Sequence, residues 1–446
     1  MLRAIVLAAG KGTRMKSARP KVLHELCGRP MLWYVLSALR AAGIQEITVV
    51  TSAELQPHLT QFNVRAVLQE PQLGTGHAVQ IALREFPPHD GDMMVLCADM
   101  PLVDSVMIRS IVDAAGAANE KPCALALVTA RVPLPSNFGR VIRKGEVISR
   151  VVEERDCTDE QRTVEEVNAG MYLFGEPLLR DAVGALTNDN AQNEYYLTDA
   201  VQILADRGER VIAVPAQDPQ SVMGINDRSE LARARRELNL RLCDRYMRDG
   251  VTIIDPATTY LEPELRFGAD TIIYPNTTLG RLSEVGMRCE IGPNTRLSHC
   301  RLGNDVIIKE SVVVDSELGD NVKVGPFAHV RSNTLLCNGV HVGNFVEVKA
   351  SRLGAGVKAG HLSYLGDATI GEKANIGAGT ITCNYDGVKK SETHIGKGAF
   401  IGSNSSLIAP VTIGEGALTG ASSVVTKNVE AGQRVAGNPA KPLGKK

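Results

Sequence analysis

The sequence has 446 residues, more than a single hydrophobic core usually supports, so two or three domains are expected. Hydrophobic residues make up 44% of the chain and charged residues 22%, a composition that excludes extensive disorder. With 49 basic and 50 acidic residues the net charge is −1, so no overall electrostatic field favours nucleic acid or an anionic membrane as a partner.

The nine cysteines and the first residues of the chain indicate a reducing compartment. The number of cysteines is odd and none forms a C-x-x-C pair, which argues against a disulfide framework and against a zinc site. The first residues lack the pattern of a signal peptide, and no apolar run reaches the length of a transmembrane helix. We therefore expect a cytoplasmic protein without a membrane partner.

From the start to residue 226, the sequence alternates between strand and helix patterns. Short apolar runs at residues 4–7, 47–50 and 93–96 alternate with helical patterns such as residues 31–42. This rhythm is typical of a Rossmann-like α/β domain with a mainly parallel sheet. The first predicted domain is therefore residues 1–226.

A glycine-containing loop, L-A-A-G-K-G-T-R-M, follows the first predicted strand at residues 7–15. Its glycines let backbone N–H groups approach a phosphate, and Lys11 and Arg14 supply positive charge. The spacing of a Walker loop is absent, so this loop alone is more often a solvated turn. Further segments favour a functional site, namely P-K-V-L at 20–23, Gln69, L-G-T-G at 73–76 and C-A-D-M-P-L at 97–102.

In this order the segments resemble the sugar-nucleotide pyrophosphorylase family, and within it the uridylyltransferases that use N-acetylglucosamine 1-phosphate. The resemblance implies a binding site for UTP and the UDP-sugar that is formed by Leu7, Ala8, Ala9, Gly10, Lys11, Lys21, Gln69, Gly74, Thr75, Cys97, Ala98, Asp99, Gly139, Glu153, Asn168 and Asn226. Within this set it assigns the uracil and ribose to Gly10, Gln69, Gly74 and Thr75, and the sugar to Gly139, Glu153 and Asn168. Ala98 departs from the family, whose members often carry glycine there.

The resemblance also implies catalytic roles for Arg14 and Lys21 facing the triphosphate, and Mg²⁺ ligation by Asp99 and Asn226. Attack of one phosphate on another requires charge neutralisation and in-line placement more than a protein nucleophile. Oxygen donors suit Mg²⁺, which usually keeps water and phosphate ligands as well. Taken singly, Asp99 would be a strand-end cap and Asn226 a turn residue; together with the loop they favour the metal.

A connecting helix is predicted over residues 227–250. Asp227 and Glu230 have the spacing of a capping box, and Leu231, Ala234, Leu238 and Leu242 follow at helical spacing.

Beyond this helix, residues 251–446 form a predicted domain whose apolar positions recur every six residues. They are Phe267, Ile273, Leu279, Val285, Ile291 and Leu297, then Val306, Val312, Leu318, Val324, Val330, Leu336, Val342 and Val348, and finally Ile395, Ile401, Leu407 and Ile413, with Thr419 and Val425 in phase. Stacked coils of a β-solenoid explain this period, because each coil presents equivalent inward positions to its neighbours. The pattern resembles the left-handed parallel β-helix of hexapeptide-repeat proteins.

Within the solenoid, His361 and Tyr364 interrupt the apolar positions, and residues 382–390 break the repeat as a loop. A lone histidine is more often a structural hydrogen-bonding residue. However, Arg331, Lys349 and Lys390 can bring positive charge, and insertions in solenoids commonly form binding edges.

These features extend the resemblance over nearly the whole chain, to the bacterial family of bifunctional N-acetylglucosamine-1-phosphate uridyltransferases and glucosamine-1-phosphate acetyltransferases. It implies that His361 is the general base for acetyl transfer from acetyl-CoA to glucosamine 1-phosphate. The residues it assigns to glucosamine 1-phosphate are Arg331, Lys349, Tyr364 and Asn375. Those it assigns to acetyl-CoA are Ala378, Asn384, Tyr385, Ser403 and Ala421. It further implies a homotrimer and a product, UDP-N-acetylglucosamine, that supplies peptidoglycan and lipopolysaccharide synthesis.

The C-terminus departs from this family near Asn438, where known members carry an arginine that contacts CoA. Arg434, Lys441, Lys445 and Lys446 are alternative sources of that charge. Two rival interpretations remain open. One is a nucleotidylyltransferase whose β-helix serves only assembly or regulation, and the other is a non-enzymatic scaffold like the regulatory subunits of a translation-initiation exchange factor.

Overall fold

The computed structural model of the chain describes residues 2–117 and 121–444. The chain forms two compact units, Met1–Arg236 and Glu237–Lys446, and the division falls within helix α7 (Arg228–Arg248). The sequence-based limits at residues 226 and 250 therefore remain a proposal. In the described ranges, no helix is both long enough and apolar enough to cross a lipid bilayer.

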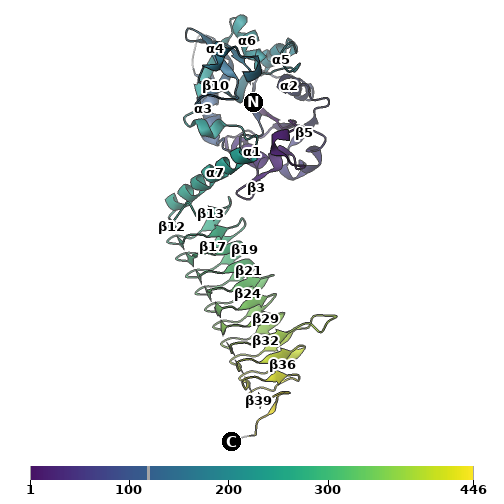
Figure 1. Cartoon of the computed structure of the whole chain (residues 1–446), viewed down its shortest axis with the longest axis vertical. Helices are drawn as coiled ribbons and strands as arrows, with labels where there is room; N and C mark the ends of the chain where they lie inside the picture. Colours follow the sequence, from purple (N-terminus) through teal and green to yellow (C-terminus); the bar gives the residue numbers. More distant parts are fainter. Residues whose placement is uncertain (1, 118–120, 445–446) are drawn as a thin grey trace. The chain divides into compact units, whose positions relative to one another are not determined.

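A central sheet organises the first unit (Figure 1), with strands in the order β11-β7-β10-β6-β1-β4-β5 and the hairpin β8–β9 attached to β10. The pairs β1–β4, β1–β6, β4–β5 and β11–β7 are parallel, whereas β10 runs antiparallel to β6 and β7. This confirms the predicted, mainly parallel sheet. The strands are β1 (Leu2–Leu7), β4 (Ile47–Thr51), β5 (Arg65–Leu68), β6 (Asp92–Cys97), β7 (Cys123–Arg131), β8 (Arg140–Lys144), β9 (Val147–Val152), β10 (Glu166–Gly175) and β11 (Arg210–Pro215), besides the small pair β2 (Glu25–Leu26) and β3 (Arg29–Pro30).

Helices cover both faces of this sheet, because successive residues of a strand point to opposite sides. In β1, Ala4 and Val6 belong to the core that contains residues of α1 and α3, while Ile5 belongs to the core that contains residues of α2, α5 and α6. The helices of the unit are α1 (Met31–Ala41), α2 (Thr75–Arg84), α3 (Ser105–Gly116), α4 (Asp159–Arg162), α5 (Glu176–Gly184), α6 (Asp199–Asp206) and the first turns of α7.

The carboxyl ends of the neighbouring strands β1 and β6 place two predicted motifs side by side. Leu7 pairs with Cys97, and the Ala98 N–H donates to the Leu7 carbonyl at 3.0 Å. The glycine-containing loop after β1 and the Asp99 segment after β6 therefore meet at one edge. This edge is where α/β sheets bind their ligands.

The second unit is a parallel β-helix, in which each strand pairs with its equivalent in the next coil (Figure 1). The column Ile273, Ile291 and Ile308 shows the register. One long sheet contains β12 (Thr252–Ile253), β15 (Ile272–Ile273), β18 (Glu290–Ile291), β20 (Ile307–Ile308), β22 (Lys323–Val324), β25 (His341–Asn344), β28 (Lys358–His361), β31 (Asn375–Ile376), β34 (Phe400–Ile401), β37 (Leu418–Thr419), β39 (Arg434–Ala436) and the antiparallel β40 (Lys441–Pro442).

The other long sheet contains the remaining strands of the coils. They are β13 (Tyr260–Leu261), β14 (Arg266–Phe267), β16 (Thr278–Leu279), β17 (Glu284–Val285), β19 (Arg296–Leu302), β21 (Val312–Leu318), β23 (His329–Arg331), β24 (Thr334–Leu336), β26 (Glu347–Lys349), β27 (Arg352–Leu353), β29 (Tyr364–Gly366), β30 (Ala368–Ile370), β32 (Ile381–Cys383), β33 (Thr393–Ile395), β35 (Ser406–Ile408), β36 (Val411–Ile413) and β38 (Val424–Val425).

The period of six predicts most inward positions correctly and is wrong at Val312. That side chain is 37% exposed, whereas Val313 is fully buried. The buried column passes from Ile308 to Val313 and then to Leu318, so two sides of the coil advance by five residues instead of six. The inward position at this point is therefore Val313, one residue later than the period of six predicts. Phe267 is half-buried and lies against the Tyr246 ring, with 5.0 Å between ring centroids.

The second half of α7 closes the open end of the β-helix. The Asn239 side-chain amide donates to the Thr259 carbonyl at 2.7 Å, and its oxygen accepts from the Leu261 N–H at 2.9 Å. The predicted apolar positions of the helix, Leu231, Ala234, Leu238 and Leu242, are all buried. The part of α7 from Glu237 onwards therefore belongs to the hydrophobic core of the second unit, in addition to connecting the α/β domain to the β-helix.

Candidate active sites

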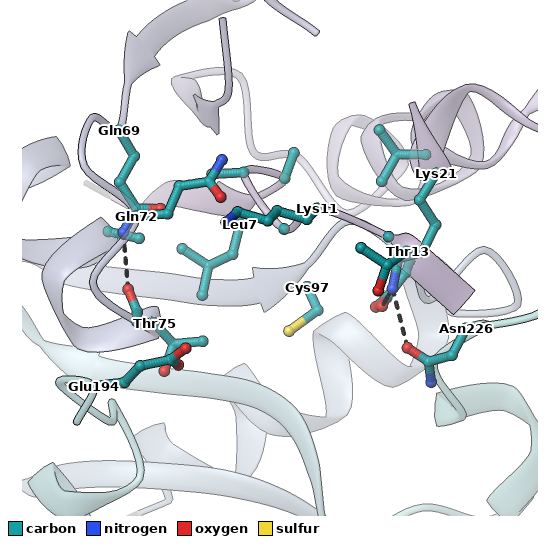
Figure 2. Close-up of a pocket in the computed structure, with 18 of the residues that line it drawn as sticks. Leu7, Lys11, Thr13, Lys21, Gln69, Gln72, Thr75, Cys97, Glu194 and Asn226 are labelled. Atoms are coloured by element: carbon teal, nitrogen blue, oxygen red, sulfur yellow. Dashed lines mark hydrogen bonds and ion pairs between the residues drawn. The ribbon is translucent and has the colours of Figure 1, made fainter. Parts of the chain in front are cut away.

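A cavity of about 510 Å³ opens at the carboxyl ends of β1 and β6 (Figure 2). The predicted nucleotide residues that line it are Leu7, Ala8, Ala9, Gly10, Lys11, Arg14, Lys21, Gln69, Gly74, Thr75, Cys97, Asp99 and Asn226. Gly12, Thr13, Val22, Gln72, Ala78, Gln192 and Glu194 line it as well. Four predicted residues, Ala98, Gly139, Glu153 and Asn168, are not part of its wall.

One end of the cavity is organised around Gly74, just before α2. Gly74 has φ +105°, and a side chain there would lie 2.6 Å from the Tyr195 carbonyl oxygen, so this position requires glycine. The buried Gln69 amide donates to the Gly74 carbonyl at 2.9 Å, and the Thr75 hydroxyl accepts from the Leu197 N–H at 3.0 Å. This end offers amide and hydroxyl groups of the kind that recognise a base and a ribose.

The other end carries positive charge and the predicted metal ligands (Figure 2). The Lys21 ammonium forms an ion pair with the Asp99 carboxylate and donates to the Asn226 side-chain oxygen at 3.1 Å. The two oxygens thus converge on one cation. This donor set also fits Mg²⁺, which prefers carboxylate and carbonyl oxygens. Across residues 2–117 and 121–444, no group of three or more histidine, cysteine, aspartate or glutamate side chains could hold a metal, so phosphate and water would have to complete the coordination.

Neighbouring backbone groups hold these two residues in place. The Ile225 N–H donates to the Asp99 carbonyl at 2.9 Å, which ties the two segments together. The Glu230 N–H donates to the Asp227 carboxylate at 2.8 Å, as the capping box predicts. The Glu230 carboxylate, however, accepts from the Asn226 N–H at 2.6 Å rather than from Asp227, so the helix start orients Asn226.

Cys97 lies in the middle of the cavity wall (Figure 2). Burial, and to a smaller extent the nearby Asp99 carboxylate, raises the pKa of the Cys97 thiol to about 12. The thiol is therefore neutral at physiological pH and is a poor nucleophile. This agrees with direct phosphoryl chemistry, which needs no covalent enzyme intermediate.

The three residues predicted to contact the sugar lie at neighbouring strands: Gly139 directly before β8, Glu153 directly after β9, and Asn168 on β10. The Asn168 N–H donates to the Gly139 carbonyl at 2.8 Å, and the Thr198 hydroxyl donates to the Glu153 carboxylate at 3.0 Å. Burial raises the pKa of Glu153, and the hydrogen bond from Thr198 partly offsets this effect. The structure thus brings Gly139, Glu153 and Asn168 together as a second, polar subsite.

In the β-helix, His361 belongs to a column of residues at one corner of successive coils. Backbone hydrogen bonds join the column: Leu362 N–H to Asn344, Gly379 N–H to His361, Asn404 N–H to Ala378, and Ser422 N–H to Ser403. The predicted CoA residues Ala378 and Ser403 therefore lie in the coils directly after His361, and Ala421 precedes Ser422 in the next coil. One corner of the β-helix therefore carries the predicted base and three of the five residues predicted to bind CoA.

The His361 ring is exposed, and one of its nitrogens has a defined partner. Its Nδ1 lies 2.5 Å from the Asn344 side-chain oxygen in the preceding coil. Because an amide oxygen only accepts, Nδ1 carries a proton, and in the neutral ring the lone pair is then on Nε2. That tautomer is the one a general base requires.

The adjacent sheet carries the residues predicted to bind the sugar phosphate. Arg331 and Lys349 are partners in neighbouring coils, and the Arg331 guanidinium donates to the Glu347 carboxylate at 2.9 Å. The neighbouring Lys349 lowers the pKa of Lys390. Such a cluster of cations suits a phosphate.

Tyr364 and Asn384 are also brought together, since the Asn384 amide lies 3.5 Å from the Tyr364 hydroxyl and also donates to the Asp367 carboxylate. Asn375 lies on β31, in register with Lys358. Tyr385 is 60% exposed in the predicted loop, where it forms an antiparallel bridge with Lys390 and its hydroxyl donates to the Gly387 carbonyl at 2.6 Å.

At the C-terminus, the described alternatives for the missing arginine are Arg434 and Lys441. They lie on β39 and β40, which pair antiparallel, and Asn438 lies in the turn between them. Lys445 and Lys446 lie outside the described residues.

Several residues that line the first cavity or contact a predicted site residue have no clear signal in the sequence. Gln192, Glu194 and Thr198 come from a segment without helical or strand periodicity that packs against the Gly74 turn, and Asn344 precedes His361 by a full coil. A cluster of polar and aromatic residues between two helical patterns is the one available hint for the first three.

Comparison with known proteins identifies the families to which the two units belong. The family described as MobA-like NTP transferase domain matches residues 4–143, and that described as bacterial transferase hexapeptide (six repeats) matches residues 315–350 and 392–427. The hexapeptide match confirms that the β-helix is of the predicted left-handed class.

Relatives match along almost the entire chain. The bifunctional protein GlmU of Heliobacterium modesticaldum is 47% identical over 96% of this chain and 94% of its own length. The bifunctional GlmU proteins of Geotalea uraniireducens and Thermotoga maritima are each 44% identical over the same shares of both chains. The chain belongs to the family of bifunctional GlmU proteins.

Proposed function

We propose that this chain performs two consecutive transfers. The β-helix transfers an acetyl group from acetyl-CoA to glucosamine 1-phosphate, and the first unit transfers a uridylyl group from UTP to the resulting N-acetylglucosamine 1-phosphate. The products are CoA, pyrophosphate and UDP-N-acetylglucosamine. The observation that carries this proposal is the similarity to bifunctional relatives over 96% of the chain, which spans both sites.

In the acetyl transfer, His361 Nε2 accepts a proton from the 2-amino group as that nitrogen attacks the thioester carbonyl, and the CoA thiolate leaves. A positioned base contributes about 10²–10⁴-fold in rate. Arg331 and Lys349 hold the sugar phosphate together with Tyr364 and Asn375. Ala378, Asn384, Tyr385, Ser403 and Ala421 line the acetyl-CoA site.

In the uridylyl transfer, a phosphate oxygen of N-acetylglucosamine 1-phosphate attacks the α-phosphorus of UTP, and pyrophosphate leaves. Lys11, Arg14 and Lys21 neutralise negative charge on the triphosphate. Asp99 and Asn226 would hold Mg²⁺, which supplies further charge neutralisation when bound. Gln69, Gly74 and Thr75 orient the nucleoside.

We include a homotrimer and a cytoplasmic location in this proposal. His361 and the corner residues in the coils after it lie on the outer surface of the β-helix. The β-helix of a neighbouring subunit would enclose them. A cavity of about 390 Å³ on the β-helix is lined by Asp367 and Lys390 but by none of the residues proposed to hold the sugar phosphate. We infer that a second subunit at this face would complete the site.

Product analysis tests both transfers in one experiment. The purified protein is given glucosamine 1-phosphate, acetyl-CoA, UTP and Mg²⁺, and each component is omitted in turn. We expect UDP-N-acetylglucosamine only in the complete mixture, and acetylated sugar phosphate when UTP or Mg²⁺ is omitted. If supplied N-acetylglucosamine 1-phosphate is converted but glucosamine 1-phosphate is never acetylated, the protein is a nucleotidylyltransferase with a structural β-helix. Failure to turn over any nucleotide would favour the scaffold.

A further inference from the structure

Arg140 begins strand β8 and is an unusual core residue, because its side chain is only 1% exposed. Burying a guanidinium is costly unless its donors are paired. The residue therefore has to be explained by what it contacts.

The Arg140 guanidinium donates hydrogen bonds to two backbone carbonyls and forms an ion pair with one carboxylate. Its Nη2 donates to the Ser136 carbonyl at 2.8 Å and lies 2.8 Å from the Glu154 carboxylate, and its Nη1 donates to the Phe138 carbonyl. Glu154 is held in turn by the Arg162 side chain at 3.1 Å. The guanidinium of Arg140 thus connects the loop before β8 to the turn after β9.

Each proposed sugar contact is adjacent in sequence either to Arg140 or to a residue that pairs with Arg140 in the sheet. In the sheet it pairs with Val152 on β9 and with Val167 on β10. Gly139 directly precedes Arg140, Glu153 directly follows Val152, and Asn168 directly follows Val167. A shift of this row would displace all three contacts at once.

The loop that Arg140 holds extends towards the phosphate end of the site. Ser136 and Phe138 line a cavity of about 520 Å³, and Arg14 and Asn226 line the same cavity. The residues whose carbonyls bind Arg140 therefore line a cavity that is also lined by a proposed triphosphate contact and a proposed metal ligand.

We propose that Arg140 is a positioning residue for uridylyl transfer, which sets the geometry of the sugar 1-phosphate subsite through the loop at Ser136–Phe138 and through Glu154. This inference rests on the proposed function. The side chain itself touches neither substrate. Its effect is to fix Gly139, Glu153 and Asn168 relative to the phosphate end, where a small displacement of the attacking group costs rate.

The test compares substitutions at Arg140 with a matched control on the same strand. Arg140→Met removes the guanidinium. Arg140→Lys keeps the charge but presents a compact ammonium, which cannot reproduce the planar arrangement of the two carbonyl hydrogen bonds and the ion pair with Glu154. The control is Arg143→Met, which removes the same charge from β8. Arg143 pairs with Glu166 at 2.7 Å, and within the described residues its side chain makes one other hydrogen bond, to the Glu146 carbonyl at 2.8 Å.

We expect Arg140→Met to lower kcat/KM for N-acetylglucosamine 1-phosphate by about 10–100-fold, mainly through KM, while KM for UTP changes by less than about twofold. Arg140→Lys should be intermediate, and Arg143→Met should match the wild type. Acetyl transfer should be unchanged in all three. Thermal melting measured on the same samples reports any loss of stability.

A purely structural role predicts a different pattern, namely a lower melting temperature with wild-type KM values for both substrates in the folded protein. That pattern, or equal changes in KM for the sugar phosphate and for UTP, would overturn the inference. If Arg140→Met does not fold, Arg140→Lys and Glu154→Gln decide, because each should still raise KM for the sugar phosphate selectively. A wild-type protein without any uridylyl transfer would instead refute the proposed function.

Discussion

At the scale of single residues, the two proposed sites depend on side chains held by partners from distant parts of the chain. Asp99 and Asn226 face one cation, Lys21, and the same two residues would hold the proposed Mg²⁺. The His361 ring is oriented by the contact between its Nδ1 and the Asn344 side-chain oxygen. Substitutions at these positions should therefore separate the two activities cleanly.

Asp99→Ala removes the carboxylate proposed to hold Mg²⁺. We expect uridylyl transfer to fall by at least about 100-fold, because charge on the triphosphate is no longer neutralised in place. Acetyl transfer, measured separately with acetyl-CoA and glucosamine 1-phosphate, should stay at the wild-type rate. Loss of both activities in a folded protein would contradict two independent sites.

His361→Ala removes the proposed base from an exposed position. Acetyl transfer should fall by about 10²–10⁴-fold in single-turnover measurements, while acetyl-CoA binding, oligomeric state and uridylyl transfer persist. Asn344→Ala should cause a smaller loss, since it frees the tautomer without removing the base. If His361 were a structural corner residue, the substitution would instead lower the melting temperature and leave the surviving protein active.

Asp199, at the start of α6, predicts a pH dependence of stability. Burial, and to a smaller extent the Asp156 carboxylate, raises the pKa of Asp199 from 3.8 to about 6. Between these values the folded protein binds more protons than the unfolded chain, so stability falls as pH rises and the full cost is present above about pH 6. The melting temperature of Asp199→Asn minus that of the wild type should therefore be larger at about pH 7.5 than at about pH 4.5. An equal difference at both pH values would count against a raised pKa.

At the scale of secondary-structure elements, the coils of the β-helix stack so closely that some inter-coil contacts leave no room for a side chain. Gly343 on β25 and Gly360 on β28 occupy the same position in adjacent coils. A methyl group at Gly343 would lie 1.9 Å from the Gly360 carbonyl oxygen, whereas one at Gly360 would meet nothing within 4 Å. The same residue type thus has different steric requirements in neighbouring strands.

Gly343→Ala should destabilise the β-helix by about 1–3 kcal/mol, the usual range for overpacking. Gly360→Ala is the matched control, and its melting temperature should lie close to that of the wild type. Uridylyl transfer at moderate temperature should survive in both. Equal melting temperatures for the two variants would show that the stacked backbone can move apart at this row.

At the scale of the whole molecule, the second half of α7 contributes to the unit that contains the β-helix. Asn239 and Tyr246 contact the first coils, and the compact unit begins at Glu237. A β-helix that starts at residue 252 would expose the core end that this helix segment covers. The proposed domain limits can therefore be tested with fragments.

Fragments 237–446 and 252–446 should both acetylate glucosamine 1-phosphate and sediment as trimers if the β-helix is an independent module. We expect the longer fragment to have the higher melting temperature, because it keeps the buried Leu238, Asn239 and Leu242. Sedimentation and calorimetry measure the two properties separately. A monomeric fragment with full activity would contradict a site shared between subunits.

The sequence alone determined the classes of the two units and most of the inward positions of the β-helix. It could do so because hydrophobic periodicity and glycine-containing turns express local geometry. The shift at Val312 shows the limit of this reasoning, since five-residue sides depend on which backbone groups pair between coils. Only the tertiary structure decided which distant residues meet, because those contacts depend on how separate elements pack. Lys21 lies 78 residues from Asp99 and 205 from Asn226, and no local pattern relates Thr198 to Glu153, Arg140 to Glu154, or Asn344 to His361.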